Sequence, residues 1–549
     1  MIPRPIDRRT FLAGALAVGA AACSGDSDGD PTTPGSGAAS STAPTSSTGP
    51  ATTSTVLPAT PPPTTIATVA DPQKVPGVGD GLFRLGVASG DPLPGSVVLW
   101  TRLAPEPLDG GGMPNVDVPL RWQVADDERF RSIVASGIVT TRPDEAHSAH
   151  VDVVGLRPRR EYFYRFTTGG EASPVGRTRT APAAESSPRQ LRLVFASCQD
   201  WQDGYWTAWP HIVDEDPDVV LWLGDYIYEG GIGEDVVRPH NSGEVMSLAQ
   251  YRNRWALYKG DPLLQAAHAA APWIVTWDDH EVEDNYAGRF PKDPADAAIF
   301  RQRRAVAYRA AWEHQPIRGG RPTGPSLRIY RSLSWGRLAE LFVLDGRQYR
   351  SDQPCGGDSD LGEGCAQRTS PSRTMLGMEQ RRWLNRRLER SDGRWSVLAN
   401  QTVLTPIPFG PLFNLDQWDG YAHERDAVVD MLRRRRNAVV LTGDIHAAGV
   451  GTLGVDAERN RPAGTEFVGT SISSPFVEGL EDVVAELVED LPQGKWFDAR
   501  HRGYGLCTVT PRQWTTDHRI VSTVTQRRAT VSTNSSWAVR DKVPGAEQV

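Results

Sequence analysis

Short apolar runs recur from residue 190 onward in this 549-residue chain, with helical segments between them. Runs that are apolar throughout, such as 219–223, are typical of strands covered on both faces. Between them, apolar residues repeat with a helical period, for instance at Leu376, Trp383, Leu384 and Leu388. Strands that alternate with helices predict a layered α/β domain, with central β-sheets flanked by helices. The expected strands span residues 191–196, 219–223, 273–277, 341–344, 396–399 and 438–441.

The residues directly after these strands supply a thiol, a phenol, carboxylates, amides and imidazoles. Because open α/β sheets gather their sites at the carboxyl ends of their strands, we expect five strand ends to meet at the edge of one sheet. This mixture of ligand types predicts a metal site, and the number of ligands indicates more than one metal. The candidate residues are Cys198, Asp225, Tyr228, Asp279, His280, Asn285, Asn400, Asp444 and His446.

Each of these pieces alone also fits an ordinary role. A Gly-Asp pair after a strand is usually a turn, and Asp279 could lie in the first turn of a helix. Arg347 could contact a phosphate or form a salt bridge with Asp345 or another carboxylate. Cys198 could be a nucleophile, although a reactive thiolate prefers cationic neighbours unless a metal binds it. Their joint occurrence at successive strand ends favours the metal site.

Residues 79–183 have a different sequence pattern, in which apolar and polar residues alternate as in half-buried strands. Leu156-x-Pro158 followed by Tyr162 resembles the tyrosine corner of fibronectin-type sandwiches. We find no polar constellation here that could do chemistry. This part is therefore expected to be an accessory all-β, fibronectin/Ig-like sandwich that precedes a catalytic domain at 190–535.

The amino-terminal region predicts export. Arg8-Arg9 precedes an apolar stretch at 11–22 that is too short for a transmembrane helix, so residues 1–22 are interpreted as a twin-arginine signal peptide. Cys23 follows three alanines and resembles a lipidated cysteine, although Ala20 stands where a Leu is usual. Residues 23–78 are rich in Ser, Thr and Pro and are expected to be a disordered tether. We therefore expect a location on the outer face of the cytoplasmic membrane, in the cell wall or outside the cell.

The remaining cysteines and the charge limit the possible partners. Cys355 and Cys365 flank a Gly-rich loop, which favours a disulfide in an oxidising compartment, and Cys507 is expected to be an inert buried thiol. A formal net charge of −8 argues against nucleic-acid binding. The arginine run 433–436 is an exception, which we interpret as the solvated end of a helix. We expect a monomer.

The strand-end motifs resemble those of the alkaline phosphatase D (PhoD) family, whose layout is of the calcineurin-like metallophosphoesterase type. The resemblance covers roughly residues 80 to 535. The matching stretches are Phe195-Ala-Ser-Cys198-Gln, Leu223-Gly-Asp225-Tyr-Ile-Tyr228-Glu, Thr276-Trp-Asp-Asp279-His280-Glu-Val-Glu-Asp-Asn285, Leu344-Asp345-Gly-Arg347, Leu441-Thr-Gly-Asp444-Ile-His446 and Gly86-Val-Ala-Ser-Gly-Asp91-Pro.

The resemblance implies an iron(III) ion, Fe(3+), held by Cys198, Asp225, Tyr228 and His446. Asp225 would bridge to a second site that binds Ca(2+). Thiolate and phenolate donors suit a trivalent transition metal, whereas oxygen donors suit calcium. The calcium ligands would be Asp279, Asn285 and Asp444, to which we add Asn400 by our own inference.

The expected activity is hydrolysis of phosphomonoesters, phosphodiesters or both, by attack of a metal-bound hydroxide on phosphorus. His280 would hydrogen-bond a phosphoryl oxygen or protonate the leaving group, with Asp279 and Arg347 as further catalytic candidates. Two alternatives remain open. One is a phosphodiesterase directed at lipids or teichoic acids, and the other is a non-catalytic cell-surface binding protein on the same fold.

Overall fold

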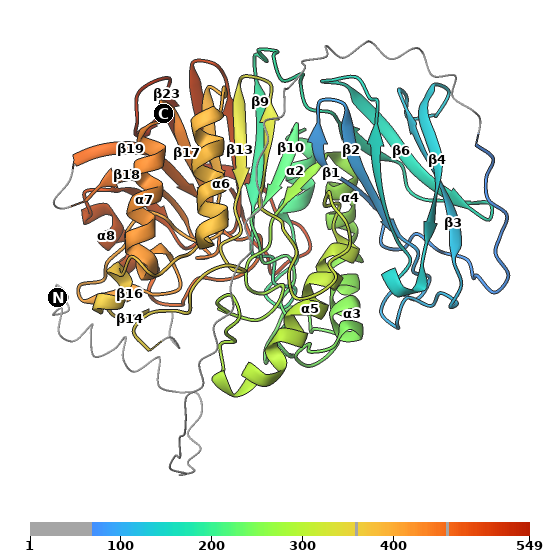
Figure 1. Cartoon of the computed structure of the whole chain (residues 1–549), viewed down its shortest axis with the longest axis horizontal. Helices are drawn as coiled ribbons and strands as arrows, with labels where there is room; N and C mark the ends of the chain where they lie inside the picture. The colour runs from blue at the N-terminus through green and yellow to red at the C-terminus, as the bar shows by residue number, and fades with distance from the viewer. Residues whose placement is uncertain (1–68, 357–360, 457–459) are drawn as a thin grey trace, which may run out of the picture. The chain divides into compact units, whose positions relative to one another are not determined.

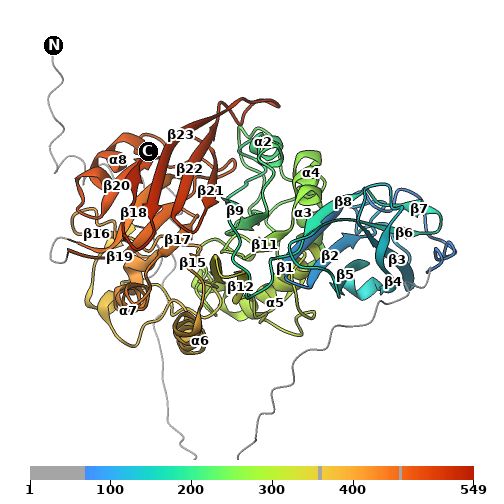
Figure 2. The ribbon, with the colours of Figure 1, turned by 90° about the horizontal axis from the view of Figure 1, so that it is seen from above.

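Two large β-sheets pack face to face in the computed structural model, which describes residues 69–356, 361–456 and 460–549 (Figure 1). Aliphatic side chains from both sheets fill the space between them, among them Leu193, Leu221, Val397 and Leu441. Helices cover the two outer faces, as Figure 2 shows from above. The expected layered α/β class is confirmed. Within the described residues, no helix is both long and apolar enough to cross a membrane.

The first sheet has ten strands, and its parallel centre carries three of the expected strands. In spatial order the strands are β24 (Glu547–Gln548), β23 (Val531–Arg540), β22 (Gln513–Val521), β21 (Gly503–Val509), β9 (Leu191–Ala196), β10 (Val219–Trp222), β11 (Trp273–Val275), β1 (Val87–Leu93), β2 (Ser96–Arg102) and β5 (Ser148–Val154). The sheet therefore continues past residue 535, where the catalytic domain was expected to end.

The second sheet has seven strands, of which β13, β15, β17 and β19 are parallel neighbours. Its order is β12 (Arg331–Trp335), β13 (Ala339–Val343), β15 (Trp395–Ala399), β17 (Ala438–Thr442), β19 (Asn460–Val468), β18 (Ala448–Val455) and β20 (Gly494–Asp498). The expectation that the site's strand ends share one sheet is wrong. They are divided between two sheets, because strands buried on both faces look the same in sequence whichever sheet they join.

Helices cover the outer faces of both sheets. The first sheet is covered by α2 (Ala208–Asp214), α3 (Leu248–Lys259), α4 (Pro262–Ala270) and α5 (Ala297–His314), and the second by α6 (Gly377–Arg390) and α7 (Ala422–Arg433). A further helix, α8 (Glu481–Asp490), lies against β20. Local sequence fixes several helix starts. Ser247 and Gln250 form a reciprocal capping box at α3, and Asp261 caps α4 just before Pro262.

The expected amino-terminal sandwich is present, but it is not a separate module. One layer consists of β3 (Val118–Ala125), β4 (Ile133–Thr141), β6 (Glu161–Thr168), β7 (Glu171–Ala172) and β8 (Gly176–Arg179). The other layer is β1, β2 and β5, which belong to the ten-stranded sheet through a parallel pairing of Gly90 with Trp273. An ion pair of Asp91 with Arg331, at 2.5 Å, strengthens this junction. A short ribbon of β14 (Leu361–Glu363) and β16 (Leu412–Asn414) completes the strands.

The carboxyl-terminal part of the expected tether contacts the sandwich. The backbone carbonyl of Val69 accepts a hydrogen bond from Arg121 at 3.0 Å, and Asp71 accepts one from the Thr167 hydroxyl at 2.5 Å. The ordered chain thus begins earlier than residue 79. The signal peptide, Cys23 and the rest of the tether lie outside the described residues.

The tyrosine corner predicted from the sequence is confirmed. The hydroxyl of buried Tyr162 accepts a hydrogen bond of 2.9 Å from the backbone N–H of Arg157, five residues upstream. This bond fixes the connection that leads from β5 into β6.

We expect Tyr162→Phe to lower the free energy of unfolding by about 1 kcal/mol, because it leaves the Arg157 N–H without its acceptor. The urea midpoint of the purified protein measures this. Tyr205→Phe serves as the control, since the Tyr205 hydroxyl makes no hydrogen bond to any described residue. Equal midpoints for the two variants would contradict the prediction.

Candidate metal centre

The backbone bends into the left-handed region at several of the predicted ligands. The angle φ is 58° at Cys198, 57° at Asp225, 55° at Asn285, 70° at Asp444 and 55° at His446. For residues with a Cβ this conformation costs roughly 1–2 kcal/mol each. Such strain persists only where surrounding structure enforces it, and it concentrates at functional sites.

Two glycines allow the strand ends to approach each other closely. A Cβ on Gly224 would lie 2.5 Å from the Cβ of Asp278, and one on Gly443 would lie 2.4 Å from the Ser197 hydroxyl. The Gly before each aspartate is therefore needed for packing between neighbouring loops, in addition to its role in a turn.

The first ligand group brings together Cys198, Asp225 and His446. Their ligand atoms lie within 4.8 Å of one another, although the residues come from ends of both sheets. The Tyr228 hydroxyl joins them, since it donates to Asp225 at 3.3 Å and lies 3.3 Å from His446 Nε2. His446 Nδ1 donates to the carbonyl of Pro475 at 2.8 Å, which leaves Nε2 directed at the group. All four side chains predicted for one metal are thus adjacent.

The environment of Cys198 does not support a nucleophile. Burial, followed by the carboxylates of Asp225 and Asp444, raises the pKa of the thiol well above its ordinary value. A protonated, buried thiol is unreactive, and a thiolate here needs a cation to stabilise it. Burial lowers the pKa of His446 to about 4, so its imidazole is neutral, as metal coordination requires.

The second ligand group is formed by carboxylates. Asp278, Asp279 and Asp444 have oxygens within 4.8 Å of one another, and Asp225, Asp279 and His280 form an overlapping group. Asp225 and Asp279 therefore connect the two parts of the centre. The backbone N–H of Asn285 donates to Asp279 at 2.6 Å, which places that predicted ligand next to the group.

Several buried oxygens of these groups accept no hydrogen bond from the described residues. One of them is Asp225 Oδ1, on a residue that is 1 % exposed. Asp279 Oδ1 also accepts no hydrogen bond, although Arg347 Nη2 lies 3.4 Å from it. Leaving a buried carboxylate oxygen without a partner is costly. Metal coordination would satisfy these atoms, so the donor set fits cations.

Arg347 lies at the centre of the carboxylates and is fully buried. It pairs with Asp278 and, at 2.8 Å, with Asp416, and its Nη2 lies 3.4 Å from Asp279 and 3.5 Å from Asp444. The salt-bridge interpretation of this residue is therefore correct, but with carboxylates other than Asp345. Its predicted contact with phosphate stays a prediction.

His280 is held by a carboxylate. Its Nδ1 donates to Glu229 at 2.8 Å, and its ring stacks on Tyr228 at 4.1 Å between centroids. Burial opposes the charged form, but the carboxylates of Glu229, Asp279 and Asp225 outweigh it and raise the pKa of His280 well above its ordinary value. A cationic imidazole beside the carboxylates can donate a proton or a hydrogen bond to a phosphoryl group.

Comparison with known proteins agrees with this geometry. The family model of PhoD-like phosphatase matches residues 193–518, and that of the PhoD-like phosphatase N-terminal domain matches residues 70–182. The chain belongs to the PhoD-like phosphatase family. It is 46% identical over 483 residues to alkaline phosphatase D of Bacillus subtilis (strain 168), which covers 85% of this chain and 82% of that protein. A solved structure of PhoD superposes with a TM-score of 0.83 at 45% identity, covering 86% of this chain and 93% of the other.

Membership in the PhoD-like phosphatases makes the chain a phosphoric ester hydrolase, as its motifs predicted. The family implies metal dependence, and the grouped Asp, Cys and His side chains are suited to it.

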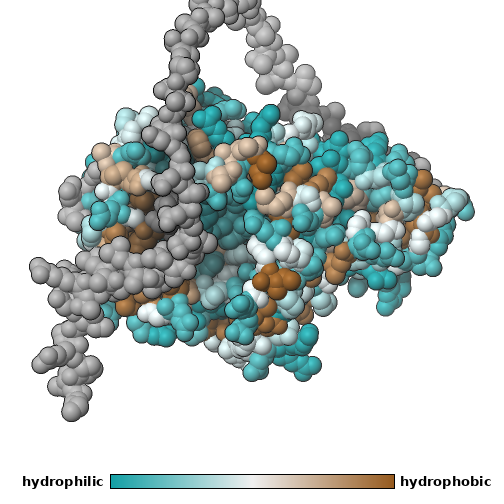
Figure 3. Space-filling model, turned by 90° about the horizontal axis from the view of Figure 1, so that it is seen from below, coloured by the Kyte–Doolittle hydropathy of each residue, from teal (hydrophilic) through white to brown (hydrophobic). Residues whose placement is uncertain are grey.

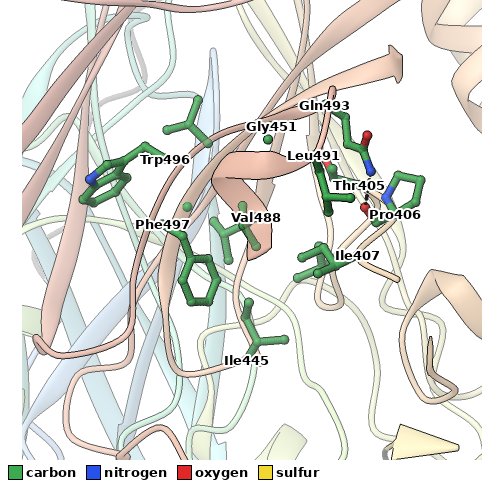
Figure 4. Close-up of a pocket in the computed structure, with 15 residues that line it drawn as sticks. Thr405, Pro406, Ile407, Ile445, Gly451, Val488, Leu491, Gln493, Trp496 and Phe497 are labelled. Atoms are coloured by element: carbon green, nitrogen blue, oxygen red, sulfur yellow. Dashed lines mark hydrogen bonds between the residues drawn. The ribbon is translucent and has the colours of Figure 1, made fainter. Parts of the chain in front are cut away.

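The face in Figure 3 is largely hydrophilic, with apolar residues in separate clusters. Next to the centre, Ile445 lines an apolar cavity with Val488 and Phe497 (Figure 4), but its volume of about 20 Å³ holds only about one water.

One predicted ligand, Asn400, already has hydrogen-bond partners in the protein. The side-chain amide of Asn400 donates to the Thr402 carbonyl, and its oxygen accepts from the Trp418 ring N–H at 3.4 Å. The role of Asn400 as a metal ligand stays a prediction.

The disulfide between Cys355 and Cys365 is present, and Cys507 is a buried free thiol.

Sequence reasoning missed residues that support the ligands. Asp278 and Glu229 stand inside the quoted motifs, so their position after a strand was an available signal. No local signal indicates Asp416, which pairs with Arg347, or Ser474, whose hydroxyl donates to Tyr228 at 2.8 Å. Both come from loops without a recognisable motif.

We expect Glu229→Gln to lower kcat/KM about 10- to 100-fold, because the neutral amide no longer fixes the His280 ring and its proton. Hydrolysis of a chromogenic phosphomonoester measures it. Glu234→Gln, an exposed change in the same loop, should leave activity unchanged. Wild-type activity in Glu229→Gln would show that the pair is dispensable.

Proposed function

We propose that this PhoD-like phosphatase hydrolyses phosphomonoesters, phosphodiesters or both with the aid of iron(III) and calcium. The observation that carries the proposal is the meeting of a thiol, a phenol, a carboxylate and an imidazole at one point, formed by Cys198, Tyr228, Asp225 and His446. This donor set is wrong for calcium alone and suits a trivalent transition metal.

Calcium fits the neighbouring carboxylates better than zinc does. Asp278, Asp279 and Asp444 offer only oxygen donors, and hard cations prefer them. We propose Asp279, Asn285 and Asp444 as the ligands, with Asn400 as a further candidate, and Asp225 as the bridge between the two sites. Asp278 is already engaged by Arg347, which makes it a supporting residue.

Bound metals would neutralise the phosphoryl oxygens and activate a water for attack on phosphorus. The protein's own residues would position the ligands and handle the proton. Arg347 holds the carboxylates of Asp278 and Asp416 in place, and Glu229 fixes the ring of His280. His280 is the group positioned to hydrogen-bond a phosphoryl oxygen or to protonate the leaving alkoxide.

We expect Cys198→Ala to lose iron, visible colour and activity together while the fold survives, since thiolate and phenolate ligands of iron give charge-transfer absorption. Tyr228→Phe should weaken the absorption, because it deletes only the phenol oxygen. Elemental analysis and the visible spectrum of protein from its native exporting host measure both.

If Cys198 is a metal ligand, we also expect thiol reagents to alkylate it slowly in the intact enzyme. Cys507→Ala is the control, because that thiol lies outside the ligand group. Fast alkylation, full metal content in Cys198→Ala and a trapped phosphocysteine would favour a nucleophilic cysteine. Colourless, fully active protein with calcium alone would refute the iron assignment without refuting the phosphoesterase.

We further propose that the protein is exported by the twin-arginine machinery and anchored by a lipid at Cys23. The support is the Arg8-Arg9 pair, the short apolar stretch after it and the small residues before Cys23. A disulfide at Cys355 and Cys365 also suits an oxidising compartment. The proposed site of action is the outer face of the membrane or the cell wall, with the protein as a monomer.

Replacing Arg8-Arg9 by Lys-Lys should trap the precursor in the cytoplasm, because the twin-arginine route reads that pair. Fractionation of the native host, followed by immunoblotting, measures it. Normal secretion of the variant would refute this route.

A further inference from the structure

A cavity of about 630 Å³ lies far from the metal centre, and six of the fifteen residues that line it are cationic. We call it the arginine pocket. Its volume lies within the range of about 300–1,000 Å³ found for small-ligand sites. The cationic residues that line it are Arg337, Arg394, Arg434, Arg435, Arg436 and Lys542.

The pocket has an excess of positive charge in a chain that is negative overall. Against its six cations stand only Asp392 and Asp541, although the formal net charge of the chain is −8. Arg394 forms an ion pair with Asp541 at 2.8 Å. Within the described parts of the chain, Arg337, Arg436 and Lys542 are exposed and form no ion pair. A hollow lined by charges of one sign raises the local concentration of ions of the opposite sign, here anions.

The floor of the pocket is rigid. Buried Asn437 donates to the carbonyl of Arg394 at 3.0 Å and to Asp541 at 2.7 Å, and it accepts from the backbone N–H of Lys542 at 2.7 Å. Arg435 is fixed by hydrogen bonds to Ser396 at 3.1 Å and to the carbonyl of Ser391 at 2.8 Å. Three distant segments are thus joined, so the backbone that carries the cations is held in place before an anion binds.

The pocket cannot be an extension of the metal centre. Leu338, Arg394 and Asn437 directly precede β13, β15 and β17, whereas Asn400 and Asp444 follow the carboxyl ends of β15 and β17. These strands are parallel and five residues long. The pocket therefore lies at their amino ends and the metal centre at their carboxyl ends, roughly 16 Å apart along the strands.

We propose that the arginine pocket binds a phosphate-bearing anion at a site independent of the metal centre. Guanidinium groups match phosphate oxygens with two parallel hydrogen bonds, and several exposed guanidinium groups face one cavity here. Three members of the arginine run 433–436, interpreted from sequence as a solvated helix end, line this pocket together with Arg337 and Lys542; they are Arg434, Arg435 and Arg436. The anion comes either from a soluble phosphate or from a lipid headgroup.

The test compares Arg337→Ser/Arg436→Ser with a control of equal charge change, Arg129→Ser/Arg131→Ser, whose residues are exposed on the amino-terminal sandwich. Calorimetry with inorganic phosphate follows binding to the metal-loaded enzyme, and product inhibition separately follows phosphate at the metal centre. Flotation with phosphatidylglycerol/phosphatidylcholine vesicles, against phosphatidylcholine alone, follows headgroup binding.

We expect the pocket variant to weaken one anion-binding event at least about tenfold, since each charged hydrogen bond contributes that much. Its kcat/KM and product inhibition should match the wild type. A loss seen with phosphate identifies a soluble anion, and a loss seen only with anionic vesicles identifies a lipid headgroup. Unchanged binding in the pocket variant, or an equal loss in the control, would overturn the proposal.

Discussion

The buried guanidinium of Arg347 is the interaction on which the rest of the centre depends. Four carboxylates, from Asp278, Asp279, Asp416 and Asp444, lie around it inside the protein. Burying this much negative charge without compensation would be prohibitive, and removing one partner of a buried ion pair typically costs about 3–5 kcal/mol. Arg347 therefore allows the ligands to be assembled in the folded chain before any metal arrives.

The position of this cation also explains why the site spans two sheets. Asp278 and Asp279 follow β11 of the first sheet, whereas Asp444 follows β17 of the second. Arg347, which follows β13, contacts carboxylates from both. The apolar layer between the sheets holds their ends at a fixed separation, and the left-handed residues turn the side chains inward. Packing thus positions the ligands, and charge compensation makes their burial possible.

Acidic and basic residues gather at two different places in the molecule. Acidic residues at the carboxyl ends of strands in both sheets, such as Asp225 after β10 and Asp444 after β17, gather in the candidate metal centre. Arg337, Arg394 and Arg436, which lie shortly before β13, β15 and β17, line the arginine pocket. Carboxylates suit metal cations, and guanidinium groups suit phosphate oxygens. Acidic and basic residues are therefore segregated to opposite ends of β17, with Asp444 after the strand and Arg436 before it.

Much was already determined by sequence. Strand ends followed by Cys198, Asp225, Tyr228, Asp279 and His446 predicted that these side chains would lie close together, because functional residues gather at the carboxyl ends of parallel strands and because the motifs are those of a phosphatase family. The tyrosine corner at Tyr162 and the disulfide were also predictable, since each depends on a short local pattern.

Only the tertiary structure decided which sheet each strand joins, that the sandwich continues into the catalytic sheet at Gly90, and that Asp416 and Ser474 support the site. The same holds for the meeting of Arg337 and Lys542 with Arg434, Arg435 and Arg436 of the arginine run. Local periodicity reports whether a strand is buried, but it carries no information on which neighbour it pairs with. Contacts between distant loops arise from that pairing, so they could not be seen in the sequence.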